Sequence, residues 1–215
     1  MEFIYLILCV MAIALVYHLY SHFKPKRFFL IEQYAFPEGL SARLAKKYPH
    51  LESHQIAEIM EGLRQYFQLC LLNKRQQLSM PSEAVDQAWH EFILSTRAYQ
   101  HFCHRCFGYF LHHTPAEAMV SKEEGTEGLA RVWKAACKLE NIDPIWPQRL
   151  PHLFEIDAKF KIENGFYYSN NCRSRRKGES GFYCASAMGC GGGGDSGWGV
   201  GGDAGGGGCG GGGGD

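Results

Sequence analysis

The stretch VDQAWHEFILSTRAYQHFCHRCFGYFLHHTP, Val85 to Pro115, decides the fold class. It carries five of the chain's ten histidines, a C-x-x-C pair and a run of aromatic residues. At about 100° per residue, ten of its positions fall within a sector roughly 110° wide on a helix. A stripe of this kind predicts an amphipathic helix with a buried aromatic face. Its members are Val85, Ala88, Trp89, Phe92, Thr96, Tyr99, Cys103, Cys106, Phe107 and Phe110.

Both cysteines of the C-x-x-C pair, Cys103 and Cys106, lie inside this stripe. A buried cysteine behaves as a small hydrophobic residue. A structural zinc site needs a second ligand pair, and thioredoxin chemistry needs a βαβ context, and neither accompanies this pair. The sequence therefore predicts that these two thiols pack in the core.

The opposite face of the same helix carries polar residues, among which Asp86 and His90 are four positions apart and hence neighbours. A carboxylate one turn from an imidazole is a common second-shell partner of metal-bound histidine. His112 and His113 follow Gly108 and either turn back towards His90 or cap backbone carbonyls. We therefore hypothesise a zinc or iron site formed by Asp86, His90 and His112 or His113, although no H-E-x-x-H spacing is present. A solvated polar face, which also carries Arg97, is the alternative, and it is favoured for His101 and His104.

The rest of the body is also predicted to be helical. One apolar stripe runs from Ile56 to Leu71 and another from Leu129 to Cys137. Thr114, Pro115 and Glu117 form a capping-box pattern at the start of a further helix. We predict an all-α fold with a helical domain over 37–163, preceded by a connector over 24–36.

The N-terminal segment Phe3–Tyr20 contains no charged residue, and a helix of this length rises about 27 Å, close to the thickness of a bilayer's hydrocarbon core. It predicts a single transmembrane anchor within 1–23, with the lipid bilayer as partner. Lys24, Lys26 and Arg27 follow the segment, which predicts a cytoplasmic body, in a bacterial inner membrane. A cleaved signal peptide and a buried core helix are the alternatives, but no small-x-small cleavage site follows.

The C-terminal segment 164–215 has a different composition. Eighteen of the 27 residues from Gly189 to Asp215 are glycine, which predicts a disordered tail. The spacing of Cys172, Cys184, Cys190 and Cys209 does not match the usual zinc-binding patterns. The basic run RSRRK, Arg173–Lys177, suggests a short surface for anionic lipid.

The residues of the opening stretch, with LPHLFEID further on and the glycine-rich C-terminus, resemble the glycine-rich domain-containing proteins of plants and bacteria. The resemblance covers about residues 37–160 and implies a helical domain without implying a reaction. Its matching positions are Val85, Asp86, Trp89, His90, Tyr99, Cys103, Gly108, His112, His113 and Pro115.

Two functions are compatible with these features. Lys+Arg and Asp+Glu are both 22, so no excess of positive charge indicates a nucleic-acid partner. The absence of a nucleophile–base pair favours a non-enzymatic interaction or assembly module, which binds a protein partner or self-associates through its tail. The alternative is a metal-binding protein or metal-dependent enzyme centred on Asp86, His90 and His112 or His113.

Overall fold

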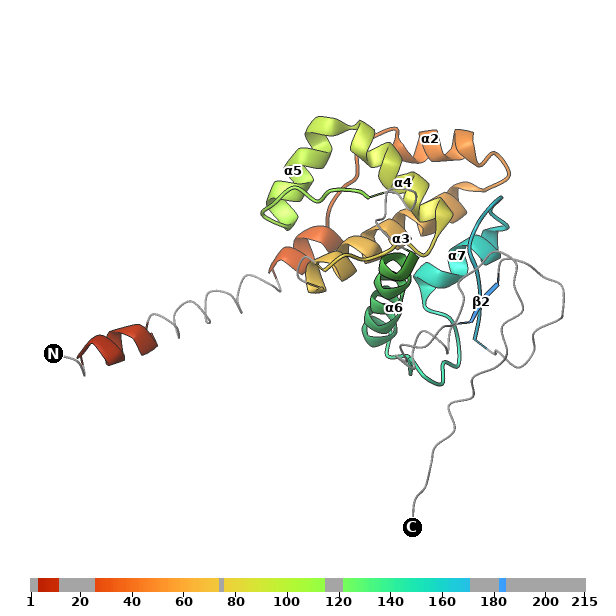
Figure 1. The fold of residues 1–215 in the computed structure, drawn as a ribbon. Helices are drawn as coiled ribbons and strands as arrows, with labels where there is room; N and C mark the ends of the chain where they lie inside the picture. Colours follow the sequence, from red (N-terminus) through yellow and green to blue (C-terminus); the bar gives the residue numbers. More distant parts are fainter. Residues whose placement is uncertain (1–3, 12–25, 74–75, 115–121, 171–181, 185–215) are drawn as a thin grey trace, which may run out of the picture.

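The computed structural model describes residues 4–11, 26–73, 76–114, 122–170 and 182–184, and most of these residues lie in helices. Figure 1 shows that the helices between residues 40 and 160 pack together, with α3 (Ser53–Leu72) at their centre. The predicted all-α class is confirmed for the described residues. The expected domain boundaries are not tested by the structure and stay predictions. The main helices are α2 (Leu40–Lys47), α3 (Ser53–Leu72), α4 (Glu83–Leu94), α5 (Thr96–Cys106), α6 (Lys122–Leu139) and α7 (His152–Phe160). Helical turns also cover 4–11 and 26–32.

A short parallel sheet completes the described fold. Strand β1 (Tyr167–Ser169) pairs with β2 (Phe182–Cys184), and Tyr168 lies opposite Tyr183. Tyr168 is buried, and its ring lies against that of Phe154 on α7 at a centroid distance of 4.9 Å. The sheet therefore packs against the helical body through α7 and does not form a separate layer of the fold.

Helix α3 forms the centre of the core and contacts α2, α4, α6 and α7. Its predicted apolar stripe is buried, with Leu71 partly so. Gly62 permits a close helix crossing, because a Cβ there would lie 2.5 Å from Ile156 Cδ1 and 3.0 Å from Val85 Cγ2. Phe67 is fully buried among the rings of Trp89, Phe92, Phe102 and Phe107.

The single helix predicted for the opening stretch is two helices in the structure. The chain leaves helical geometry at Ser95, where φ is −82° and ψ is 60°, and α5 starts in a new direction. The aromatic stripe is buried as predicted, except at Thr96 and at Phe110. Phe110 is not buried, because α5 ends at Cys106 and Gly108 takes a left-handed φ of 78°.

The carboxylate of Asp157 on α7 fixes the start of α4. It accepts hydrogen bonds from Ser82 Oγ at 2.7 Å, Glu83 N at 2.7 Å and Ala84 N at 3.2 Å. Ser82 is the N-cap and accepts from Val85 N at 3.2 Å. A negative charge here also matches the positive end of the helix dipole. The position and direction of α4, which carries the candidate site, thus depend on α7.

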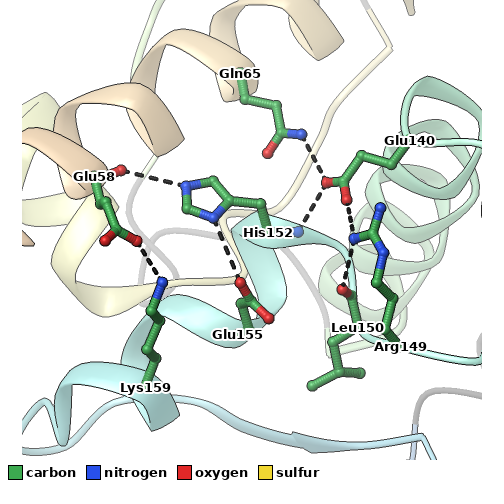
Figure 2. A network of polar contacts seen from close by, with 8 residues as sticks. All are labelled: Glu58, Gln65, Glu140, Arg149, Leu150, His152, Glu155 and Lys159. Carbon is green, nitrogen blue, oxygen red and sulfur yellow. Dashed lines mark hydrogen bonds and ion pairs between the residues drawn. The ribbon is translucent and has the colours of Figure 1, made fainter.

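A second polar network joins α3, α6 and α7 (Figure 2). Glu140 Oε1 accepts from Gln65 Nε2 and from the backbone N–H of His152, both at 2.8 Å. Lys159 on α7 donates to Glu58 on α3. The Glu140 contacts hold the first turn of α7 against the end of α6, and the Lys159–Glu58 pair joins the last turn of α7 to α3.

The predicted N-terminal anchor is not supported. In the part of the chain that the structure describes, no helix combines the length and apolar character needed to cross a membrane. The predictions of a span over 3–20, of the bilayer as its partner and of a single-pass inner-membrane localisation are therefore wrong.

Several other expectations concern residues outside the described ranges. These include the glycine-rich tail, the RSRRK run, Cys172, Cys190 and Cys209, and the capping-box residues Pro115 and Glu117. Cys184 is described only as part of β2.

Candidate metal centre

Helix α4 supplies two of the three candidate ligands. Asp86 and His90 are separated by four residues, so their side chains lie one above the other on the same face. The structure places His90 Nδ1 3.1 Å from Asp86 Oδ2. This is the pairing that the sequence indicates.

The third candidate ligand, His113, is brought to α4 by the segment that follows α5. Tyr99 on α5 donates a hydrogen bond from its hydroxyl to the carbonyl of Leu111 and accepts one from Trp89 Nε1 at 3.1 Å. The Trp89 ring meets the His113 ring edge to face at a centroid distance of 4.4 Å. This contact and the hydrogen-bonded chain orient His113, whose Nε2 lies 2.8 Å from Asp86 Oδ1.

Asp86, His90 and His113 thus form a compact cluster, in which one ligand atom from each lies within 4.8 Å of the others. The cluster is buried on one side only. The side chain of His113 is 8% exposed, that of Asp86 23% and that of His90 42%. His113 therefore forms the inner wall of the cluster and His90 its solvent-facing edge.

Sequence reasoning missed one charged neighbour of the cluster, Glu83. Burial raises the pKa of its carboxyl, and the negative charges of Asp86 and Asp157 raise it further, while Lys47 and His90 act in the opposite direction. The spacing could have indicated Glu83, because it lies three positions before Asp86 and seven before His90 and therefore shares their helix face.

The other histidines of the opening stretch lie outside the cluster. His112 is exposed, and its ring packs against Phe110 at a centroid distance of 4.9 Å. His101 and His104 are exposed on α5. Of the two alternatives at the end of the stretch, the structure brings His113 to Asp86 and leaves His112 apart.

The cysteine pair is not part of the cluster either. Cys103 and Cys106 are both fully buried, as predicted. Burial raises the pKa of the Cys106 thiol to about 11, and it raises that of Cys103 as well. Because a thiol binds metal as the thiolate, these residues are inert packing groups at neutral pH.

Two imidazoles and one carboxylate are a donor set that suits zinc and iron. Without an ion, the same nitrogens hydrogen bond to Asp86, so binding would require both to present a lone pair.

A separate cavity of about 330 Å³ is lined by Leu30, Gln33, Tyr34, Ala35 and Arg105, none of which belongs to the cluster.

The fold and this site together define a small helical protein with a two-histidine, one-carboxylate cluster on α4. Its sequence matches the model of the UCP032817-like family over residues 26–188, and the chain belongs to that family. The expected membership of the glycine-rich domain-containing proteins is wrong. The matched region ends just before the glycine-rich segment that contributed to that resemblance. Neither the curated proteins nor the solved structures contain a match to this chain.

Proposed function

We propose that this protein binds a single transition-metal ion, zinc or iron, at Asp86, His90 and His113. The observation that carries the proposal is the convergence of three ligand atoms within 4.8 Å, from residues up to 27 positions apart in the chain. An ion at about 2.0–2.2 Å from each ligand needs the three atoms to be at most about 4.4 Å apart, which small rotations of these side chains would provide.

The surroundings of the cluster support the same function. Trp89 and Tyr99 fix the orientation of His113 through the Leu111 carbonyl, and such outer contacts commonly orient metal-binding imidazoles. A solvated polar face would not require His113 to be 8% exposed beneath a tryptophan ring.

Metal analysis of the full-length protein tests the proposal. The protein is stripped with a chelator, reloaded with Zn²⁺ or, without oxygen, with Fe²⁺, and dialysed before its metal content is measured. We expect about one ion per wild-type chain, because three protein ligands hold it. His90→Ala and His113→Ala should lose the ion on dialysis.

His112→Ala is the matched control, because it removes the neighbouring imidazole without touching the cluster. It should retain the ion. A wild-type protein that folds but holds no metal, or a His90→Ala variant that binds as well as the wild type, would contradict the proposal.

We propose as a second function that the protein associates with copies of itself. The observation that favours it is the exposure of Ile145 and Trp146, at 41% and 71%, in the connector before α7. Asp143 Oδ1 accepts hydrogen bonds from both backbone N–H groups, at 2.8 and 3.0 Å, so the tryptophan is presented on an ordered turn. Tryptophan is enriched among the residues that carry most of the binding energy at protein interfaces.

Sedimentation velocity over a range of concentrations tests this second function. The wild type should show a species above the 24.2 kDa of one chain, and Trp146→Ser should abolish it. A wild type that sediments as a monomer at every concentration would exclude association through this turn.

A further inference from the structure

We infer that the metal centre is an open one, at which the bound ion takes a small anionic ligand from solution. This inference rests on the proposed metal-binding function. It concerns what the ion can do once bound, which the ligand set alone does not specify.

The number of protein ligands is the first argument. Structural zinc sites have four protein ligands and are closed, whereas reactive sites have three and leave a position for water or another ligand. Among the residues that the structure describes, the cluster contains Asp86, His90 and His113 and no fourth His, Cys, Asp or Glu. A two-histidine, one-carboxylate set with free positions also occurs in non-haem iron(II) oxygenases.

The asymmetric burial of the cluster is the second argument. His113 is covered by Trp89 and is only 8% exposed, so the inner side is filled by protein. His90 is 42% exposed on the opposite side. The free coordination positions therefore face solvent past His90, where a ligand can enter without rearrangement of the core.

Charge is the third argument. A divalent ion bound by one carboxylate and two neutral imidazoles keeps a net charge of +1, which favours an anion over a neutral ligand. Glu83 opposes this attraction from one turn earlier on α4, and Lys47 lies near Glu83 and partly offsets it. The inferred ligand is therefore a small anion bound through the metal itself.

Cobalt(II) reports on such a site because its visible absorption bands depend on its coordination. The full-length protein is loaded with Co²⁺ and titrated with azide at constant ionic strength. An open site should give a saturable change in the cobalt bands with a single affinity. The cobalt content must stay constant during the titration, so that the change reflects added ligand and not loss of the ion.

Glu83→Gln sharpens the test. If Glu83 is only a neighbouring charge, the variant should still bind Co²⁺ and should bind azide about fivefold more tightly, since one repelling charge is gone. Glu127→Gln on α6 removes an exposed carboxylate that pairs with Arg131, and it should keep the wild-type azide affinity.

The possible failures are distinguishable. No stoichiometric binding of Co²⁺ by the wild type would refute the metal site and the inference together. Stoichiometric cobalt with bands that azide leaves unchanged would overturn the open site alone. So would a Glu83→Gln variant that loses cobalt affinity and responds to azide when the wild type does not, because Glu83 would then be the fourth ligand.

Discussion

At the scale of single residues, Asp157 does most to hold the candidate site in place although it is no part of it. The residue is 1% exposed, and its two carboxylate oxygens accept four hydrogen bonds, from Ser82 Oγ and from the backbone N–H groups of Glu83, Ala84 and Phe166. The hydroxyl of Ser82 and the N–H of Ala84 are buried, and without the carboxylate these two donors would be left unsatisfied in the interior. One side chain thus connects α7, the start of α4 and the loop before β1.

Replacing Asp157 with Asn should therefore lower the free energy of unfolding by about 2–4 kcal/mol, because an amide offers one acceptor oxygen and turns an N–H₂ group towards backbone donors. Chemical denaturation of the full-length protein measures the loss. Asp143→Asn is the matched control, since the exposed amide oxygen can still accept from Ile145 and Trp146. Equal stability losses in the two variants would show that the α4 cap contributes nothing special.

The candidate site shows which residue-level features a sequence can predict. The Asp86–His90 pair follows from helical spacing alone and needs no knowledge of the tertiary fold. The choice between His112 and His113 does not, because it depends on the bond from Tyr99 to the Leu111 carbonyl and on the ring of Trp89. Tyr99 and Trp89 were recognisable as core residues, but their polar atoms gave no periodic signal.

At the scale of elements, apolar periodicity predicted the buried faces well and the helix boundaries less well. The stripes on α3 and α6 are buried where the pattern placed them. The break at Ser95 was missed, because the stripe stays nearly in phase across it and no Pro or Gly marks the position. Arg43 on α2 contacts the chain there, with its guanidinium bonded to the side chain and carbonyl of Glu91 and to Ser95 Oγ.

The break between α4 and α5 has a consequence for the site. A continuous helix would have carried His101 and His104 along the same face as His90. With the turn at Ser95, α5 runs in a new direction, and the chain can return after Gly108 to bring His113 back to α4. The interruption thus separates two histidines from the cluster and permits a third to enter it.

At the scale of the whole molecule, the N-terminal composition was misleading. An apolar run predicts a membrane-crossing helix from its length and lack of charge alone. The described residues contain no such helix. The family match over 26–188 likewise covers the helical body and begins after the apolar N-terminal segment.

The whole-molecule consequence of the proposed site is a coupling between metal binding and stability. An ion that binds only the folded chain, at a free concentration about 100 times its Kd, adds about 2.7 kcal/mol to the free energy of unfolding. For a protein of this size each kcal/mol raises Tm by about 2–4 °C, so Zn²⁺ should raise Tm by about 5–11 °C. Differential scanning fluorimetry with stripped protein and added Zn²⁺ measures this shift, and a chelator should reverse it. His112→Ala should respond like the wild type, and His113→Ala should not respond. An equal rise in His113→Ala would mean that the stabilising ion binds elsewhere in the chain, and the cluster on α4 would then lose its proposed role.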